Sequence, residues 1–405
     1  MVKRIDLFMP PRSQYGVLHH FTQNIAEALE RHGVRTRVLE ADYHNPAPFI
    51  DALIKDTPDC TLSLNGLLPD EKGNFFCDMI GIPHVAFIVD SQNLFIPLTY
   101  SPLTAIVCSD QFSCEFFRGL KSKNVLFMPH GVDKNIHIDE GVDRCYDVAV
   151  LCSLIDYEGN RRQWEEKYDS AVCQAMDEAV EVTLSDSSTS YIEALVQAVD
   201  RQMELSYSLN PTKIDFIGVM DDLEMYIKGK SRIDAINAIK DARVDIFGSA
   251  SETANWEQYL DKKNKNHVVH EPVPYMQALE ILGQSKILLN ASPWIKNGAH
   301  ERIFYGLGSE ALVFTNENIY LKEHFLSDQN IVLYQTSRLE DLNRSVNEYL
   351  SDNVKREKVA KAGKELVLTE HTWDSRVEIL LQELEPVILR MKQEQAAKKE
   401  DSKDK

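Results

Sequence analysis

SKILLNASPWIKNGAHERIFYGLGSEALVFTN, residues 285–316, is the stretch that decides the fold of this chain. A short apolar run at 287–289 stands between polar residues, which is typical of a buried strand. Residues 300–302 then open a segment whose apolar side chains recur at helical spacing, and a second apolar run follows at 311–314. Strand, helix and strand over this length predict a βαβ crossover in a parallel sheet.

A ligand site is expected where this predicted helix begins. Parallel sheets bind ligands beyond the carboxyl ends of their strands, and a helix start offers free N–H groups that suit a diphosphate. Arg302, in the first turn, adds a forked donor for the same anion. An ordinary βαβ unit with an exposed, salt-bridging turn is the alternative.

Length and composition predict two cores and argue against nucleic acid as a partner, with a local basic groove as the alternative because net charge says nothing about patches. A chain of 405 residues exceeds one compact domain, and its hydrophobic content of 43% suffices for two. The net charge of −19 argues against nucleic acid as a partner and against a basic, membrane-adhering surface.

Cysteine usage and the chain's start predict a cytoplasmic protein. The seven cysteines form no CxxC pair, so they are expected to be small buried hydrophobes in a reducing compartment. The chain enters a predicted strand at once, without a signal-peptide pattern, and no apolar run approaches the length of a membrane span.

Residues 1–133 predict a Rossmann-like, doubly wound α/β domain. Short apolar runs alternate with helical or turn-rich segments, as such a sheet requires. The predicted strands are 5–9, 34–39, 61–64, 85–89, 105–108 and 125–128.

Three residues of this domain are candidates for acid–base chemistry. Asp90 follows the run at 85–89, so its carboxylate is expected at the sheet edge that binds ligands; capping of the next segment is the alternative. His20 lies at the start of a predicted helix, where a solvated histidine is the alternative, and His130 follows the strand at 125–128. A general base must reach the proton that it removes, and the sequence leaves the choice among the three open.

A second Rossmann-like domain is predicted over residues 147–376. The polar, acidic segment 134–146 is interpreted as the linker. Apolar residues at three- and four-residue spacing predict a helical insertion at 165–242. A last helix at 377–392 precedes a tail, 393–405, which is expected to be disordered because it has charges and no apolar face.

The familiar phosphate, metal and nucleophile motifs are absent from the sequence. There is no GxxxxGK[ST], GxGxxG, HExxH, GxSxG or Asp-x-Asp pattern. Arg161 and Arg162, after the first strand of the second domain, form a weak candidate clamp for a phosphate, and ordinary surface arginines are the alternative.

Taken together, the chain resembles glycosyltransferases of the GT-B type, in particular the CgeB-like (spore-maturation) group. The likeness covers most of the chain and rests on the order and spacing of several short motifs. These are Asp147-Val148-Ala149-Val150 with 159–162, Phe247-Gly248, Val273-Pro274-Tyr275, His300-Glu301-Arg302-Ile303-Phe304, the ending from 331 to 376 with His371-Thr372-Trp373, and, less clearly, Val89-Asp90-Ser91 and Cys108-Ser109-Asp110.

The resemblance implies two Rossmann-like domains with a cleft between them and a last helix that crosses back to the first domain. It implies a nucleotide sugar in the second domain, UDP- or GDP-linked, with no cofactor and no bound metal. The acceptor, in the first domain, would be a protein, a glycan or a lipid-linked glycan. The residues expected at the donor are Gly248, Val273, Tyr275, Asn297, Gly298, His300, Glu301, Arg302, Tyr305 and Arg162.

Departures from the family pattern leave two hypotheses. Related retaining transferases carry Glu-x7-Glu where this chain has Asn297 and Tyr305, and Glu310 stands where a glycine is expected. One hypothesis is a metal-independent transferase that moves a sugar to a hydroxyl. The other is a catalytically silent GT-B protein that binds a nucleotide sugar or a protein partner. The helical insertion suits either, as an acceptor surface or as a homo-oligomer interface.

Overall fold

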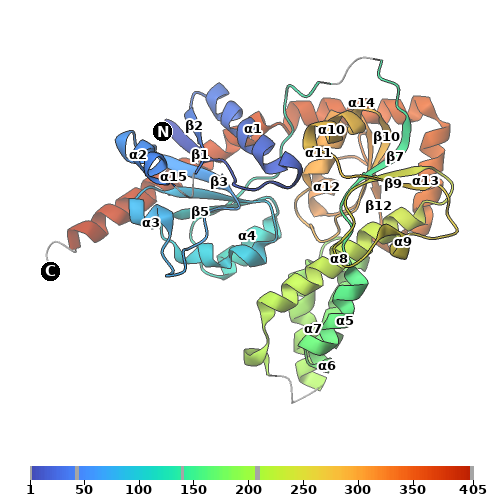
Figure 1. Cartoon of the computed structure of the whole chain (residues 1–405), viewed down its shortest axis with the longest axis horizontal. Coiled ribbons are helices and arrows are strands. Elements are labelled where there is room, and N and C mark those ends of the chain that lie inside the picture. Colours follow the sequence, from blue (N-terminus) through green and yellow to red (C-terminus); the bar gives the residue numbers. More distant parts are fainter. Residues whose placement is uncertain (1, 42–44, 138–140, 206–209, 402–405) are drawn as a thin grey trace. The chain divides into compact units, whose positions relative to one another are not determined.

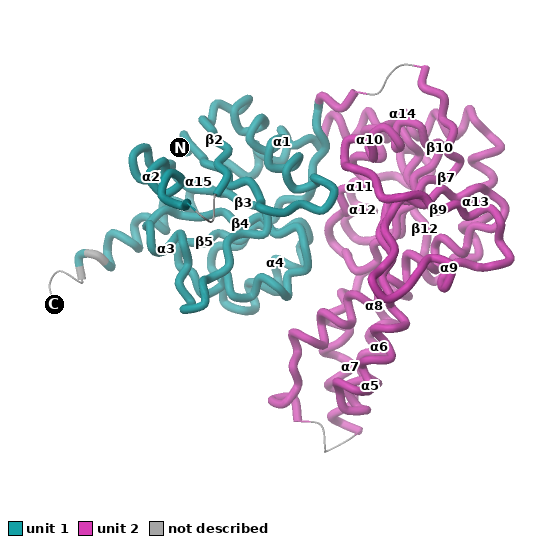
Figure 2. Tube along the Cα trace, in the orientation of Figure 1, with its two compact units in different colours: residues 1–134, 371–405 teal, residues 135–370 magenta. Residues whose placement is uncertain are grey.

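The computed structural model describes the chain except for residues 1, 42–44, 138–140, 206–209 and 402–405. The chain forms two compact units (Figure 2). Unit 1 comprises Met1–Lys134 together with His371–Lys405, and unit 2 comprises Asn135–Glu370. The segment 134–146, predicted as a linker, therefore falls almost entirely in unit 2, and its residues 138–140 lie outside the described part.

Unit 1 is built on a six-stranded parallel sheet of order β2-β1-β3-β4-β5-β6. Every residue of β1, β3, β4 and β5 is buried, as expected for parallel strands covered on both faces. The strands are β1 (Arg4–Phe8), β2 (Arg35–Leu39), β3 (Cys60–Leu64), β4 (His84–Ile88), β5 (Thr104–Cys108) and β6 (Val125–Phe127).

The helices of unit 1 come from both ends of the chain. From the first part come η1 (Gln14–Gly16), α1 (Val17–Arg31), α2 (Ala47–Lys55), α3 (Phe76–Ile80), η2 (Gln92–Tyr100) and α4 (Gln111–Gly119), and from the last part comes α15 (Trp373–Asp401). Where the sequence predicts a disordered tail from residue 393, α15 continues as helix to Asp401. Residues 393–401 are Gln, Glu, Ala, Lys and Asp without glycine or proline, and most of these favour a helix strongly enough to offset the missing apolar face.

The start of α15 is fastened into unit 1 by backbone hydrogen bonds and by one large side chain. Val132 N–H donates to His371 O at 2.9 Å, and Trp373 N–H donates to Val132 O at 3.0 Å. The Trp373 side chain is fully buried, with ring centroids 5.6 Å from Phe21 and 6.3 Å from Phe87. The Trp of the His-Thr-Trp motif is therefore a core residue of unit 1.

Unit 2 has its own six-stranded parallel sheet, of order β12-β11-β10-β7-β8-β9. Side chains alternate between two apolar layers: Val148, Ile246 and Ile287 face one, and Ala149 and Phe247 face the other. The strands are β7 (Tyr146–Leu151), β8 (Val244–Phe247), β9 (His267–His270), β10 (Ser285–Asn290), β11 (Leu312–Asn316) and β12 (Val332–Tyr334).

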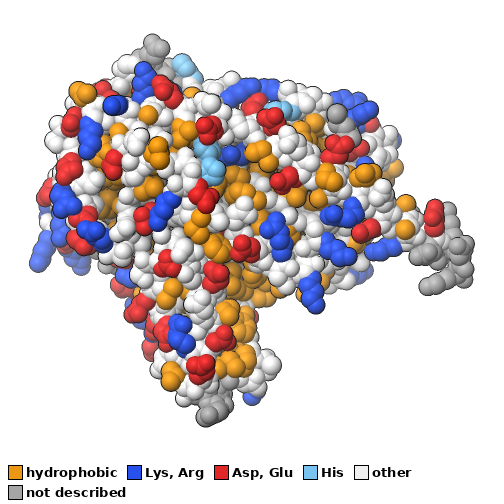
Figure 3. Space-filling view, turned by 180° about the vertical axis from the view of Figure 1, so that it is seen from behind, with side chains coloured by type: hydrophobic (Ala, Val, Ile, Leu, Met, Phe, Trp, Pro, Cys, Tyr) orange, Lys and Arg blue, Asp and Glu red, His pale blue; other side chains and the backbone are white. Residues whose placement is uncertain are grey.

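A helical insertion separates β7 from β8 and projects from the sheet of unit 2 (Figure 1). It consists of α5 (Tyr157–Lys167), α6 (Ser170–Ser185), α7 (Tyr191–Leu205), η3 (Pro211–Lys213) and α8 (Phe216–Ala238). Apolar and acidic side chains lie next to each other on its surface (Figure 3). The C-terminal half of α8 packs on the sheet, with Ile233 and Ile236 in the same core cluster as Val148.

The remaining helices of unit 2 either connect successive strands or follow β12, the last strand of the sheet. They are α9 (Trp256–Tyr259), α10 (Tyr275–Gly283), α11 (Glu301–Gly308), α12 (Ile319–His324), η4 (Thr336–Arg338), α13 (Glu340–Ser351) and α14 (Asn353–Glu370). The stretch 285–316 forms β10, α11 and β11, the βαβ crossover that its pattern predicts. In the described part of the chain, none of the helices combines the length and the apolar character that crossing a membrane would require.

Candidate functional site

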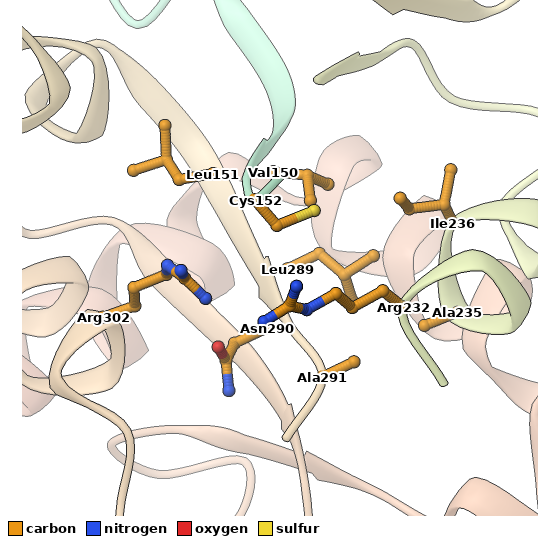
Figure 4. A pocket seen from close by; sticks show the side chains of 10 residues that line it. All are labelled: Val150, Leu151, Cys152, Arg232, Ala235, Ile236, Leu289, Asn290, Ala291 and Arg302. Carbon is orange, nitrogen blue, oxygen red and sulfur yellow. The ribbon is translucent and has the colours of Figure 1, made fainter. Parts of the chain in front are cut away.

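A small pocket lies at the carboxyl ends of β7 and β10, the edge at which a parallel sheet binds ligands (Figure 4). Two arginines enter it from different elements: Arg232 from α8 and Arg302 from the first turn of α11. The lining residues are Val150, Leu151, Cys152, Arg232, Ala235, Ile236, Leu289, Asn290, Ala291 and Arg302.

Arg232 lines the pocket, and no carboxylate of the described residues forms an ion pair with it. One of its Nη atoms donates to Ser153 O at 3.3 Å, and its guanidinium lies 5.4 Å from the ring centroid of Trp294. The side chain as a whole is partly exposed, but its Nε is buried and forms no hydrogen bond within the described residues. Burial, together with repulsion from Arg302, lowers the pKa of Arg232 to about 10. Arg232 is thus a desolvated cation that is still charged at neutral pH.

Arg302 is oriented by the two residues that precede it. Glu301 Oε2 lies 2.5 Å from His300 Nδ1, and Arg302 Nη1 lies 3.3 Å from His300 Nε2. We assign the proton to Nδ1, which donates to Glu301, so Nε2 accepts from Arg302. The backbone N–H of Arg302 is 3.4 Å from Nδ1, too long to compete with the 2.5 Å contact.

This assignment requires a neutral imidazole, and the surroundings of His300 provide one. Burial, which outweighs the attraction of Glu301, lowers the pKa of His300 to about 4. A neutral His300 can accept from Arg302, whereas a protonated one would repel it. The His-Glu-Arg motif is therefore a chain of contacts that fixes the direction of one guanidinium.

The loop between β10 and α11 is braced by the helical insertion. Lys296 is 2% exposed and donates from Nζ to Thr183 O at 2.7 Å and to Asp186 O at 2.6 Å, at the C-terminal end of α6. The Trp294 ring lies 5.3 Å from Lys228 Nζ, on the same helix as Arg232. The insertion thus contributes both a pocket cation and the anchors of the loop that leads to Arg302.

The other predicted donor residues of this loop and of α11 are buried or half-buried and do not line the pocket. Gly298 is buried, and its carbonyl accepts from Asn318 Nδ2 at 2.9 Å, while Asn297 is half-buried. Tyr305 is 2% exposed and packs against Tyr275, with ring centroids 5.6 Å apart. The Tyr305 ring therefore points into the protein.

Three further predicted residues do not line the pocket. Gly248 lies where β8 ends, and an added Cβ would run into the carbonyl oxygen of Cys152, so this glycine permits close packing of two strand ends. Val273 packs against the Ala149 layer, and Arg162 is exposed on α5. Within the described residues, no group of three or more His, Cys, Asp or Glu side chains could hold a metal ion.

In unit 1, Asp90 follows β4 with an exposed carboxylate. Asn65 donates to it from Nδ2 at 2.6 Å. The segment η2 that comes next begins at the N-cap Ser91 and has no side-chain cap hydrogen bond. The capping role, the alternative for Asp90, is therefore not observed.

The two histidine candidates differ in their surroundings. His130 is 4% exposed and lies among the rings of Phe21, Phe87 and Trp373, at centroid distances of 5.7, 6.0 and 6.3 Å. This position disfavours a general base, which must reach its substrate. His20 is half-buried on α1, and burial lowers its pKa.

Two residues of these sites were not among the sequence candidates. Arg232 belongs to a helix whose apolar spacing marks it as core, and only the basic run Lys228, Lys230, Arg232 distinguishes it from the acidic insertion. Asn65 stands in an Asn-Gly pair directly after an apolar run, which signals a turn but not a contact with Asp90.

Comparisons with known proteins find one matching family and several solved structures with a similar architecture. A family described as glycosyl transferase-like matches residues 231–382. HepE from Anabaena, solved in complex with UDP-glucose, is similar at a TM-score of 0.54 and 10% identity, with 95% of this chain and 99% of that chain covered. Sucrose-phosphate synthase from Thermosynechococcus elongatus is similar at a TM-score of 0.54 and 8% identity, with 96% of this chain and 100% of that chain covered.

A third similar structure is AviGT4, a glycosyltransferase involved in avilamycin A biosynthesis. Its TM-score is 0.51 at 12% identity, with 95% of this chain and 98% of that chain covered. No curated protein matches the sequence. Two parallel six-stranded sheets with helices around them, together with these likenesses, show that the chain has the GT-B fold of glycosyltransferases.

Proposed function

We propose that this protein is a glycosyltransferase that binds a UDP- or GDP-linked sugar in unit 2 and holds its diphosphate between Arg232 and Arg302. The observation that carries the proposal is the shared pocket of these two guanidinium groups, neither of which forms an ion pair within the described residues. Two cations in one pocket, of which Arg232 is desolvated, are costly unless an anion joins them. A diphosphate supplies that charge and accepts forked hydrogen bonds.

The same two cations would stabilise the leaving group. As the bond between the sugar and the diphosphate breaks, negative charge grows on the diphosphate oxygens, and fixed positive groups in a dry pocket favour that state. HepE has been solved with UDP-glucose, which supports a nucleotide sugar as the donor. We infer that the arginines do this without a metal ion, although T4 phage BGT, a similar structure at a TM-score of 0.50 and 10% identity, was solved with both UDP and Mn²⁺.

The acceptor would bind to unit 1, at the carboxyl edge of its sheet. Asp90 is an exposed carboxylate at the end of the buried strand β4, where a doubly wound sheet binds its ligands. It would accept the proton of the acceptor hydroxyl as that oxygen attacks the sugar.

The test is release of nucleoside diphosphate from a panel of UDP- and GDP-sugars, with and without hydroxyl acceptors. We expect release that depends on the acceptor, persists in EDTA and is lost in Arg302→Ala. Arg161→Ala is a matched control, because Arg161 pairs with Asp177 away from the pocket. Binding of UDP or GDP that is unchanged by Arg302→Ala would contradict the proposed site.

One observation favours the second candidate, a silent GT-B protein that binds a nucleotide sugar. Tyr305 occupies the position of the family's second Glu, and its side chain is buried against Tyr275. A silent protein would bind the donor with the same dependence on Arg302 but would release no diphosphate with any acceptor. Calorimetry and the release assay, applied together, separate the two.

A further inference from the structure

Asn65 makes four hydrogen bonds around the end of β4. Its backbone N–H donates to Phe87 O at 2.6 Å. Its side-chain Oδ1 accepts from the backbone N–H of Val89 at 3.0 Å and of Asp90 at 3.2 Å. Its Nδ2 donates to Asp90 Oδ2 at 2.6 Å. One side chain therefore holds both the backbone and the carboxylate of the residue proposed to act on the acceptor.

The position of Asn65 is itself fixed by the turn that follows β3. Asn65 has φ 61° and Gly66 has φ 68°, both in the left-handed region. Asn tolerates this conformation better than most residues, and Gly adopts it freely. A Cβ on Gly66 would lie 2.6 Å from Ala86 Cβ and 2.9 Å from Leu98 Cδ1, so the turn is packed tightly on β4. The Asn65 amide is thus presented by a turn with little room to move.

The carboxylate of Asp90 is engaged on one side only. Asn65 is the side chain that contacts it in the described part of the chain, and Asp90 is exposed. Ser91, and not Asp90, is the N-cap residue of η2. One oxygen of Asp90 is therefore occupied by an amide, and the other is open to an incoming hydroxyl.

We propose that Asn65 is a positioning residue, which orients the Asp90 carboxylate toward the acceptor hydroxyl. The inference rests on the proposed function. The acceptor O–H donates to the free Asp90 oxygen, and its proton passes to that oxygen as the acceptor oxygen bonds to the anomeric carbon. The bond from that carbon to the diphosphate breaks, the diphosphate leaves with the electron pair, and Asp90 later returns the proton to water. Rotation of an unheld carboxylate would lose the productive geometry.

Two substitutions test the contribution of the Asn65 amide separately from that of its left-handed backbone conformation. Asn65→Gly keeps the left-handed turn without strain and removes the side chain. Asn65→Asp keeps an oxygen that accepts from Val89 and Asp90 but sets a second carboxylate against Asp90 in place of the donor. We expect kcat to fall roughly tenfold to hundredfold in both, the range for a hydrogen bond to a charged group, with donor affinity unchanged. Wild-type kcat in Asn65→Asp would show that the Nδ2 donation has no part.

A cycle with Asp90→Asn distinguishes positioning from a structural role. If Asn65 acts through Asp90, Asn65→Gly lowers kcat in the wild-type background and has no further effect in Asp90→Asn. An equal loss in both backgrounds would mean that the turn only supports the fold, and it would overturn the proposal.

A readout without turnover keeps the inference separate from the proposed function. Crystal structures of the wild type and of Asn65→Gly should show one carboxylate orientation at Asp90 in the first and a rotated or divided one in the second. If the wild type turns over no donor with any acceptor, the proposed function fails, and the catalytic purpose of the contact fails with it. A single, unchanged Asp90 orientation in Asn65→Gly overturns the positioning role whether or not the protein is active.

Discussion

Arg232 and Arg302 enter the same pocket, the first from α8, which precedes β8 in the sequence, and the second from α11, which follows it. Neither forms an ion pair with a carboxylate in the described residues. Arg232 reaches it from a helix that begins in the insertion, and Arg302 from the first turn of the crossover helix. The pocket is therefore positively charged before any ligand arrives. Its properties as an anion site can be tested without knowledge of the sugar or of the acceptor.

Arg232→Gln should weaken UDP binding roughly tenfold to hundredfold while uridine binding stays unchanged, because only the diphosphate meets the guanidinium. The free protein should become at least as stable, since burial and repulsion from Arg302 lower the pKa of Arg232 to about 10 and removal of the charge relieves that cost. Calorimetry with UDP and with uridine checks the change in binding, and urea unfolding checks the stability of the free protein. An equal loss for uridine would assign Arg232 a structural role.

Arg302→Lys should recover only part of the UDP affinity that Arg302→Ala loses. An ammonium keeps the charge but lacks the planar fork, and it cannot reproduce the contact with His300. The double variant with Arg232→Gln should lose less than the sum of the single losses in binding free energy, because the two groups serve one anion. Additive losses in isothermal calorimetry would place the two arginines at separate sites.

His300 should make the free energy of unfolding depend on pH between 6.5 and about 4. Its pKa is about 4 in the folded protein against 6.5 as the ordinary value, so the unfolded chain takes up the proton first and stability falls as pH falls through this window. The single-site limit is about 3 kcal/mol. His300→Asn removes the titrating ring and places a residue that suits an N-cap position, so the stability of the variant should depend less steeply on pH in this window, by up to one bound proton. The free energy of unfolding of each protein is measured by urea titration from pH 4 to 7. The same dependence on pH in the wild type and in His300→Asn would refute this role.

Asp90→Asn should lower turnover roughly 10²-fold or more and leave donor affinity unchanged, because the amide keeps the shape of the carboxylate but cannot take a proton. Initial rates at saturating donor, together with UDP binding, check this. His130→Gln serves as the contrast: the ring lies in the core of unit 1, so its loss should lower thermal stability first. Nearly intact turnover in Asp90→Asn would leave the acceptor base to be sought elsewhere.

Glu310→Gly should raise the free energy of unfolding by up to about 1 kcal/mol. Glu310 has φ 56°, a left-handed conformation that costs a non-glycine residue about 1–2 kcal/mol and that glycine adopts freely. Loss of its ion pair with Lys364, at 2.9 Å, offsets part of the gain because the pair is partly exposed. Glu310→Ala, which keeps the strain and loses the pair, should be destabilised. Equal stability of the Gly and Ala variants would contradict the argument.

The fold could be predicted from the sequence because its signals are local. Short apolar runs such as 105–108 coincide with strands that are buried on both faces, and the βαβ pattern of 285–316 appears as β10, α11 and β11. The GT-B prediction is confirmed at the level of the fold. The narrower CgeB-like assignment stays a prediction.

The sites could be predicted only in part, because their contacts join distant residues. Arg302 follows from its place at a helix start, whereas Arg232 lies in a helix whose period marks one face as core and gives no indication of what its other residues meet. Asp90 follows from the end of a strand, but its contact with Asn65 depends on the adjacency of β3 and β4 in the sheet. The burial of Tyr305 likewise depends on α10, the helix against which it packs.

The anchoring of α15 in unit 1 sets an order for the events of biosynthesis. The indole that fills the space between Phe21 and Phe87 belongs to Trp373, so a ribosome must translate all of Asn135–Glu370 before the core of unit 1 can close. The segment Asn135–Glu370 is contiguous and can fold as soon as it emerges. The amino-terminal strands are thus made first and completed last, and during elongation their core lacks the indole that fills it in the finished protein.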